Sequence, residues 1–303
     1  MCHNPLVSVI IPTYGGSHYL SKALDSFIKQ SYTNIEVIVV DDNGVGEVEQ
    51  LKTATIMSEY QQFPFIRYVC HEQNINGSAA RNTGYRNSSG EYLIFFDDDD
   101  ICCVDRIFRQ VQLLNRLPDS VAAVYCSHDT FYNDKCIEII NVKASGYLLY
   151  ENLIHSMEIA TSSIMIKRSC FEKLNGFDES FRRHQDWEFV CRLSAEYEII
   201  ADDFIGYHRI LSMRFAPRNA ELAKKYREFF LQKMQPYIVR FDKKKQKKIY
   251  VWNRMDVALY YVKNHNLSSF FKEIYDINGG FYSLAFLVTR LFHIIQRCKI
   301  KMV

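Results

Sequence analysis

The stretch Tyr92-Leu-Ile-Phe-Phe-Asp-Asp-Asp-Asp100 places four consecutive carboxylates directly after an apolar run. A short apolar run that follows a glycine, here Gly90, is typical of a buried strand. Like charges this close raise one another's pKa and destabilise a fold unless a cation neutralises them. Mg²⁺ and Mn²⁺ favour carboxylate oxygens, and open α/β sheets bind ligands at the carboxyl ends of their strands. The stretch therefore predicts a divalent-cation site, and a solvated acidic loop is the alternative.

Strand-like and helix-like segments alternate on both sides of this stretch. Strands are expected at 7–11, 35–40, 66–69 and 92–96, and helices at 17–30 (with Ser17 as N-cap), 48–60 and 76–86. This order implies right-handed βαβ crossovers and a mostly parallel sheet with helices on both faces. Three strands then bring polar residues to one edge of the sheet, namely Thr13 and Tyr14, Asp41 and Asp42, and Asp97 to Asp100. That convergence predicts a ligand site.

The second half of the chain differs in pattern and in charge. Strands are expected near 121–126, 137–142 and 162–166 and a helix at 186–196, followed only by helices near 217–235, 240–264, 267–276 and 280–298. Residues 1–214 carry 19 basic and 29 acidic side chains, a net charge of −10, whereas residues 215–303 carry 18 and 6, a net charge of +12. We therefore expect an α/β domain over 1–214, with halves at about 1–118 and 119–214, and a basic helical extension over 215–303.

Composition excludes several classes of protein. No apolar run reaches the 18 or more residues of a membrane-spanning helix, and residues 6–11 are too short for a signal-peptide core, so we expect a cytoplasmic protein. The nine cysteines are scattered, with Cys102-Cys103 the only close pair and no CxxC motif, which predicts reduced structural thiols. The basic residues lack interleaved aromatics in a recognisable module, which argues against nucleic-acid binding.

Four motifs, taken in order, resemble those of glycosyltransferase family 2. They are Val7-Ser-Val-Ile-Ile-Pro-Thr-Tyr14, Val39-Val-Asp-Asp42, Ala80-Arg-Asn-Thr-Gly84 and Gly90-Glu-Tyr-Leu-Ile-Phe-Phe-Asp-Asp-Asp-Asp100. The resemblance covers about residues 6–214. It implies a Rossmann-like GT-A fold and an inverting, Mn²⁺- or Mg²⁺-dependent transfer of a hexose or N-acetylhexosamine from a UDP-sugar donor.

The resemblance also assigns donor-side roles to residues of this chain. It places Pro12, Thr13 and Tyr14 around the base, Asp42 on the uracil N3–H, Arg81 on the base or phosphates, Asp97 and Asp98 on the nucleotide sugar, and Asp99 on the metal. A tyrosine face can stack on uracil, and a carboxylate accepts N3–H in a charge-assisted hydrogen bond. The alternatives are an ordinary loop aromatic for Tyr14, an Asx turn for Asp42 and a structural salt bridge for Arg81.

On the acceptor side, His184-Gln185-Asp186-Trp187-Glu188 resembles the family's motif for the catalytic base, which implies that Asp186 is the base. Gln185 replaces the usual Glu, so Glu188 and His184 become alternates, and Trp187 either stacks on a sugar or packs in the core. A helix N-terminus favours an ionised carboxylate, and the alternative is that Asp186 only caps the helix. His208 matches loosely a position that faces the diphosphate, as a metal or phosphate ligand or as a structural histidine.

The basic C-terminal part suggests a partner. Lys243 to Lys248 and the amphipathic pattern over 281–302 are suited to an anionic membrane surface, or to packing on the acidic domain. We therefore expect a peripheral protein at the inner face of the cell membrane, with a lipid-linked glycan of surface polysaccharide synthesis as acceptor. The alternatives are an inactive sugar-nucleotide-binding module of a polysaccharide assembly complex and a sugar-nucleotide pyrophosphorylase. The loop at 13–18 has no Lys or Arg to hold a triphosphate, which argues against the pyrophosphorylase.

Overall fold

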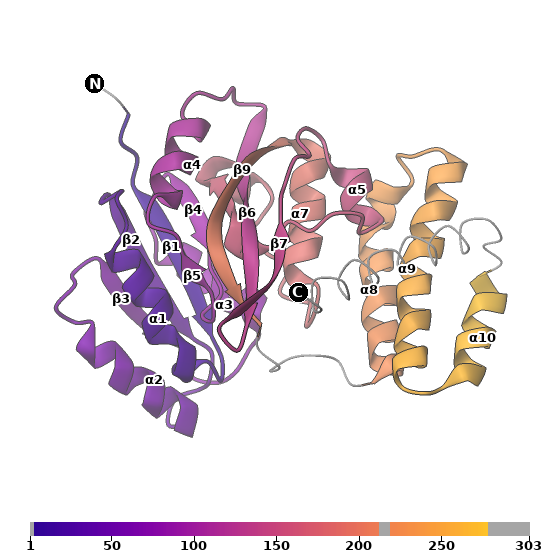
Figure 1. The fold of residues 1–303 in the computed structure, drawn as a ribbon, viewed down its shortest axis with the longest axis horizontal. Helices are drawn as coiled ribbons and strands as arrows, with labels where there is room; N and C mark the ends of the chain where they lie inside the picture. Colours follow the sequence, from indigo (N-terminus) through magenta and orange to yellow (C-terminus); the bar gives the residue numbers. More distant parts are fainter. Residues whose placement is uncertain (1–2, 212–218, 278–303) are drawn as a thin grey trace. The chain divides into compact units, whose positions relative to one another are not determined.

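A computed structural model of the chain describes residues 3–211 and 219–277 (Figure 1). The chain divides into two compact units. The first unit comprises Met1–Leu148 and Ile159–Ser212, and the second comprises Leu149–Glu158 and Met213–Val303. The second unit therefore includes a short segment from the middle of the sequence, which neither composition nor hydrophobic spacing indicates.

The described part of the first unit is built on one sheet of nine strands. Their order is β3-β2-β1-β4-β8-β6-β9-β5, and β7 pairs with β6. The strands are β1 (Val7–Thr13), β2 (Ile35–Asp41), β3 (Ile66–Cys70), β4 (Tyr92–Phe95), β5 (Ile101–Cys102), β6 (Val121–Tyr132), β7 (Lys135–Ile140), β8 (Ile164–Lys167) and β9 (Glu198–Ile210).

The first four strands in space, β3, β2, β1 and β4, are all parallel, as the βαβ order predicts. Beyond them the sheet is mixed, because β8 is antiparallel to both β4 and β6, whereas β6 and β9 are parallel. The α/β class is confirmed, and the parallel character belongs chiefly to the first half of the chain. The carboxyl ends of β1, β2 and β4 meet at one edge, since Thr13 pairs with Asp41 and Val9 pairs with Ile94.

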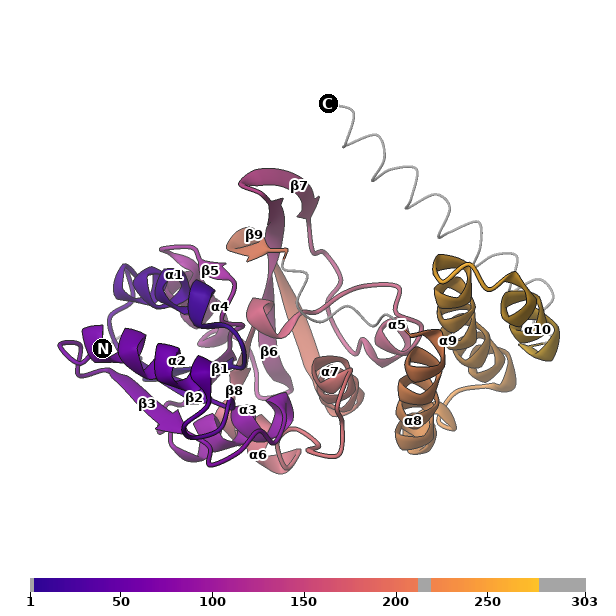
Figure 2. The ribbon, with the colours of Figure 1, turned by 90° about the horizontal axis from the view of Figure 1, so that it is seen from below.

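Helices cover both faces of this sheet (Figure 2). One hydrophobic cluster joins α1 (Ser17–Ile28), α2 (Val48–Glu59) and α4 (Arg106–Leu114) to the sheet. Aromatic contacts on the other face join α3 (Gly77–Arg86), α6 (Arg168–Lys173) and α7 (Gln185–Glu196). Both faces are thus buried, which explains why the strand sequences are continuously apolar.

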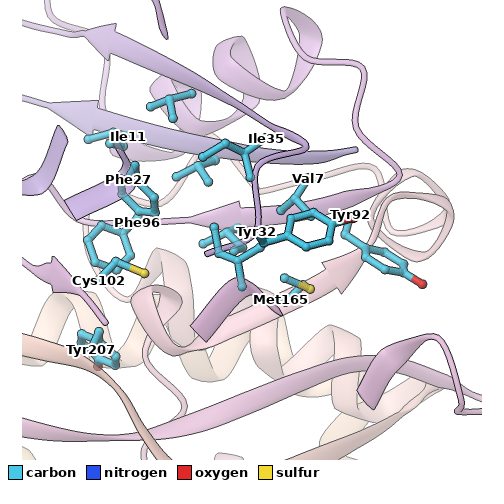
Figure 3. Packing of buried hydrophobic residues seen from close by; sticks show 14 of the residues in the cluster. Val7, Ile11, Phe27, Tyr32, Ile35, Tyr92, Phe96, Cys102, Met165 and Tyr207 are labelled. Atoms are coloured by element: carbon cyan, nitrogen blue, oxygen red, sulfur yellow. The ribbon is translucent and has the colours of Figure 1, made fainter. Parts of the chain in front are cut away.

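The core fixes β4 from both sides, and with it the start of the acidic stretch. Phe96 packs edge-to-face on Phe27 of α1 at 5.0 Å and lies beside Cys102 (Figure 3). Phe95 points to the opposite face, where its ring lies 5.0 Å from Phe171 and 4.9 Å from Phe177. Each fully buried aromatic contributes about 1.5–3 kcal/mol. The packing of Phe95 and Phe96 therefore fixes the backbone from which Asp97 to Asp100 continue.

A glycine lets α3 approach the sheet closely. A Cβ on Gly84 would lie 2.3 Å from Cγ2 of Ile10 and 3.2 Å from Cγ2 of Val40. Real Cβ contacts are not this short, so a larger residue would push α3 away from β1. The glycine that ends the Ala-Arg-Asn-Thr-Gly motif therefore holds Arg81 of the same helix near the sheet edge.

The predicted helices and strands of the first half are confirmed to within a few residues. One detail is wrong: the N-cap of α1 is Gly16, and Ser17 is inside the helix, where its hydroxyl donates to Glu49 at 2.8 Å. The sequence reading also missed β9, because its run Glu198–Ile210 carries two aspartates and a mixed polar pattern.

The described part of the second unit consists of α5 (Leu149–Leu153), α8 (Ala220–Ile238), α9 (Lys243–Lys263) and α10 (Leu267–Ile277). Asn219 caps α8 and Asp242 caps α9 through side-chain oxygens that accept backbone N–H bonds. Buried Glu273 accepts from Lys224 at 2.9 Å and from Arg254 at 2.7 Å, which ties the three long helices together. The expected helix at 280–298 lies outside the described residues. Within the described residues, no helix has the length and apolarity needed to cross a bilayer.

Candidate active site

The four aspartates form a tight turn at the carboxyl end of β4. The amide of Asp100 donates to the carbonyl of Asp97 at 3.2 Å, and the amide of Asp97 donates to the hydroxyl of Ser162 at 3.0 Å. Asp98 and Asp100 are buried, whereas Asp97 and Asp99 are half-buried. The turn thus directs alternate carboxylates toward the protein and toward the open edge, so it is not a solvated acidic loop.

Arg81 links this turn to the second half of the domain. Its guanidinium donates to Oδ1 of Asp97 at 2.9 Å and to Oε1 of Gln185 at 3.2 Å. The close approach depends on Gly77, where a Cβ would lie 2.7 Å from Oε1 of Gln185. Through its ion pair with Asp97 and its hydrogen bond to Gln185, Arg81 joins α3 to the acidic turn and to the first residue of α7.

Asp186 approaches the acidic turn from α7, in the first turn of that helix. Burial is the main cause that raises the pKa of Asp97, and the charges of Asp99 and Asp186 raise it further, while Arg81 opposes them. The N-cap of α7 is His184 in a left-handed conformation, so Asp186 is not the cap. The structure thus brings together the carboxylates from positions 97, 99 and 186, which are predicted from separate motifs.

Asp100 faces the same electrostatic problem in a more buried position. Burial raises its pKa well above the ordinary value, and the charges of Asp97 and Asp99 raise it further. Arg209 of β9 acts in the opposite direction on both Asp97 and Asp100. Sequence reasoning singled out His208 and missed Arg209, although the two are neighbours. The excess of carboxylates at this edge was the signal that a second cation would be needed beside Arg81.

The residues after β1 occupy three different environments. Thr13 is buried and its hydroxyl donates to Oδ2 of Asp98 at 2.6 Å, which connects β1 to the acidic turn. Pro12 is half-buried, and Tyr14 is 49% exposed. The ring of Tyr14 is thus partly exposed just after the end of β1.

Asp42 lies in a dense hydrogen-bond network. Its Oδ1 is 2.7 Å from Nδ1 of His71 and accepts the amide of Ile75 at 2.9 Å, while its Oδ2 accepts from Asn74 at 2.9 Å. The side chain is buried, so it fixes the loop at 71–75. In the part of the chain that the structure describes, Oδ2 accepts one hydrogen bond, which leaves its second lone pair for a further donor. His71 and Asn74 were not predicted from sequence.

The remaining predicted residues do not gather at the carboxylates. Glu188 is buried and paired with Arg192, whose guanidinium also donates to the carbonyls of Leu174 and Gly176. Trp187 is buried and contacts the ring of His184 at 5.4 Å. These contacts show a packing role for both residues.

His208 lies on β9 with both ring nitrogens in contact with other side chains. Nδ1 is 2.6 Å from Oδ1 of Asp129, and Nε2 is 3.6 Å from Sγ of Cys103. The contact with Cys103 is the main cause that raises the pKa of His208 to about 9, and Asp129 adds to it. Both ring nitrogens of His208 therefore face other side chains in this structure.

The acidic turn fits a divalent cation in the manner of an open site. Within residues 3–211 and 219–277, no three His, Cys, Asp or Glu side chains form a ready-made metal cage. Mg²⁺ and similar ions are usually bound by one or two carboxylates together with substrate phosphates. The raised pKa of Asp97 and of Asp100 marks the place where an added positive charge would relieve repulsion.

This repulsion predicts a stability effect. When folding raises the pKa of a carboxyl group, the free energy of unfolding decreases as the pH rises from the pKa of the unfolded state, about 4, toward the pKa of the folded state. Asp100→Asn keeps an oxygen to accept the Ile210 amide and removes the charge. We expect the variant to be more stable than the wild type by about 1 kcal/mol at pH 7 without metal, with the difference vanishing near pH 4.

Denaturant unfolding of the EDTA-treated proteins across this pH range measures the effect. Asp203→Asn, on an exposed carboxylate of β9, is the matched control and should change little. The electrostatic account would be contradicted if the free energy of unfolding of Asp100→Asn, relative to that of the wild type, were lower at pH 7 than at pH 4.

Comparison with known proteins agrees with this geometry. The model of the family described as Glycosyl transferase family 2 matches residues 8–174. The amylovoran biosynthesis glycosyltransferase AmsB of Erwinia amylovora is 29% identical over 246 residues, which cover 78% of this chain and 79% of that protein. An uncharacterized glycosyltransferase of Rickettsia typhi is 32% identical over 210 residues, 64% of this chain and 61% of that protein.

Solved structures share the fold. S. aureus TarS 1-349 in complex with UDP-GlcNAc has a TM-score of 0.60 and 15% identity, over 94% of this chain and 91% of that chain. The mannosyltransferase PcManGT from Pyrobaculum calidifontis, in complex with GDP-Man and Mn²⁺, has a TM-score of 0.61 and 17% identity, over 97% and 81%. These likenesses confirm the expected GT-A fold.

Proposed function

This chain belongs to glycosyl transferase family 2, and on that premise we propose that it transfers a hexose or N-acetylhexosamine from a UDP-sugar to a glycan acceptor, with inversion. The observation that carries the proposal is the electrostatic convergence of Asp97, Asp99 and Asp186. Donor-side and acceptor-side carboxylates, almost ninety residues apart in sequence, meet at one sheet edge. Arg81 bridges the two sides through Asp97 and Gln185.

The donor nucleotide is proposed to lie along the ends of β1, β2 and β4. Tyr14 offers an exposed ring for the base, beside Pro12 and Thr13. Asp42 accepts the uracil N3–H at its remaining acceptor position, and Asp97 and Asp98 contact the nucleotide sugar. The TarS neighbour was solved with UDP-GlcNAc, which supports a UDP-sugar, whereas PcManGT was solved with GDP-Man. Testing both nucleotides is therefore necessary.

Asp99 is the proposed metal ligand, and His208 is left out of this role because its ring nitrogens contact Asp129 and Cys103. When bound, Mn²⁺ or Mg²⁺ would act as a Lewis acid for the charge on the departing diphosphate. The PcManGT complex with Mn²⁺ supports the choice of ion. Arg81 holds Asp97 in position and adds positive charge beside the diphosphate.

Asp186 is the proposed general base. It takes the proton of the acceptor hydroxyl as that oxygen attacks the anomeric carbon, in a single displacement that inverts the configuration. The N-terminus of α7 favours the ionised carboxylate that this role needs. Trp187 and Glu188 act indirectly, because their packing and the Glu188–Arg192 pair hold α7 and hence Asp186 in place.

Binding of the donor tests the nucleotide site. Calorimetric titration with UDP should show binding that strengthens at least about tenfold when Mn²⁺ is added, because the cation links Asp99 to the diphosphate. Asp99→Asn should lose this metal dependence while Asp203→Asn keeps it. Equal affinity of wild type for UDP with and without Mn²⁺ would contradict the metal role, and preference for GDP would overturn the uracil assignment.

Loss of the base separates binding from transfer. Asp186→Asn should bind UDP as the wild type does and should lower transfer by about 10²-fold or more, since general-base catalysis contributes about 10²–10⁴-fold. Sugar transfer from a panel of UDP-sugars is measured with product analysis. Retained turnover would refute the base assignment. A wild-type protein that binds UDP and transfers no sugar would instead favour the inactive binding module.

The acceptor is proposed to be a lipid-linked glycan of surface polysaccharide synthesis, handled at the inner face of the cell membrane. The role of AmsB in amylovoran biosynthesis supports a polysaccharide product. The second unit supports contact with an anionic bilayer, since Lys243, Lys244 and Lys247 of α9 are exposed. On α10, Phe271 is 64% and Tyr275 85% exposed. Exposed aromatic and basic side chains are typical of interfacial segments.

Vesicle binding tests this localisation. Each basic residue near an anionic surface contributes about 1 kcal/mol, so changing Lys243, Lys244 and Lys247 together to Gln should weaken binding to phosphatidylglycerol vesicles by about tenfold to a hundredfold. The same change at Lys22, Lys29 and Lys52, which are exposed on the first unit, is the control. Sedimentation with phosphatidylglycerol and with phosphatidylcholine vesicles measures both. Absence of binding to either lipid would overturn the membrane proposal.

A further inference from the structure

Cys103, His208 and Asp129 form a line of a thiol, an imidazole and a carboxylate. Sγ of Cys103 is 3.6 Å from Nε2 of His208, and Nδ1 of the same ring is 2.6 Å from Oδ1 of Asp129. Register places the three together, because His208 pairs with Ile101 of β5 and with Asp129 of β6. We propose that Cys103 is an activated thiol, a modification site that reacts with small-molecule disulfides and other soft electrophiles.

The imidazole of His208 is placed to act on the thiol of Cys103, because Nε2 faces the sulfur while Nδ1 is held by Asp129. The pKa of His208 is raised to about 9 by Cys103 and Asp129, so the imidazole is positively charged at neutral pH. A neighbouring imidazolium is one of the groups that make a cysteine thiol reactive. Cys103 lies just before α4, and its carbonyl accepts the amide of Arg106 in that helix at 3.1 Å.

The other titratable groups around this cluster do not compete with it. Cys102 of β5 and Cys126 of β6 are buried in the core, and burial raises their pKa to about 12 and about 11, so both remain thiols. Arg106 of α4 is buried, and its guanidinium lies over the rings of Phe96 and Tyr207 in the core. Asp129 of β6 is held by the imidazole. Among these sulfur atoms, only that of Cys103 lies beside a protonated imidazole.

Cys103 is also fixed and accessible. Its amide donates to the carbonyl of Gly206 at 3.0 Å, and its carbonyl accepts from the side chain of Gln30 at 3.0 Å. Its neighbour Cys102 points into the core beside Phe96, as Figure 3 shows. Cys103 itself is half-buried, so a small reagent can reach it.

The chemistry is thiol–disulfide exchange. The thiolate of Cys103 attacks one sulfur of a small-molecule disulfide, a new S–S bond forms, and the original S–S bond breaks. The sulfur of Cys103 is oxidised, and the departing sulfur is reduced and leaves as a thiolate that takes a proton from His208 or water. This outcome departs from the expectation that every cysteine is an inert structural thiol.

The chain contains its own comparator. Cys136 of β7 is exposed, and its thiol is 3.8 Å from the carbonyl of Glu138 rather than beside an imidazole. Exposure alone would make Cys136 the faster thiol. Activation by His208 predicts the reverse order, most clearly below neutral pH, where an ordinary thiol with a pKa of about 8.5 is almost fully protonated.

The experiment follows both cysteines in the native protein by mass spectrometry. The probes are iodoacetamide and, separately, oxidised glutathione, at limiting concentrations. At about pH 6 we expect Cys103 to react at least about tenfold faster than Cys136. The rate at Cys136 should fall about tenfold for each pH unit below its pKa, while that at Cys103 falls much less. Equal rates with the same pH profile, or a slower Cys103, would overturn the proposal.

A variant tests the cause. His208→Gln should lower the reaction rate at Cys103 to that of Cys136 or below at about pH 6. In Asp129→Asn the rate at Cys103 should lie between those of His208→Gln and the wild type. The buried thiols of Cys102 and Cys126 report whether each variant is folded, because these two thiols react only when unfolding exposes them. A folded His208→Gln protein that keeps the fast rate at Cys103 would refute the proposal. These readouts measure thiol chemistry alone and are independent of glycosyl transfer.

Discussion

Repulsion among the carboxylates at the end of β4 is the constraint on which the rest of the site depends. Burial raises the pKa of Asp97 and of Asp100. The charge of Asp99 raises both further, that of Asp186 adds to the effect on Asp97, and that of Asp97 adds to the effect on Asp100. The chain opposes this with Arg81 and Arg209, and with hydrogen bonds to Asp98 and Asp100. Among the described residues, carboxylates outnumber the cations that these contacts bring to the edge, which suits it to binding a divalent ion with a diphosphate.

Such an edge needs a rigid support, and the core supplies it. Phe95, the last residue of β4, packs on one face of the sheet against Phe171 and Phe177. Phe96, the next residue, packs on the other face against Phe27. Without these contacts, repulsion could be relieved by moving the turn outward into water. Burial of the strand end thus keeps the carboxylates close enough to raise their pKa values, so packing and electrostatics are parts of one arrangement.

Sequence patterns predict the first half of the molecule well, because strand runs such as Ile35–Val40 are local signals. The exact helix start is predicted less well, since the N-cap of α1 is Gly16 rather than Ser17. Sequence patterns also predict that Asp97 and Asp186 are near neighbours, through motifs rather than spacing. They do not show which way a side chain points: Glu188 pairs inward with Arg192, and His208 contacts Cys103. Such pairings depend on tertiary contacts between distant segments, which composition and periodicity do not record.

Gln185 illustrates how a departure from a motif acquires a physical explanation. In sequence, it removes a carboxylate next to the proposed base. In the structure its amide donates to the carbonyl of Phe181 at 2.9 Å and its oxygen accepts from Arg81. A glutamate could not donate to that carbonyl and would add negative charge beside Asp97 and Asp186. The neutral amide therefore connects Arg81 to α7 without increasing the repulsion that already dominates this edge, and it leaves Asp186 as the one carboxylate in the first turn of α7 that faces the acidic turn.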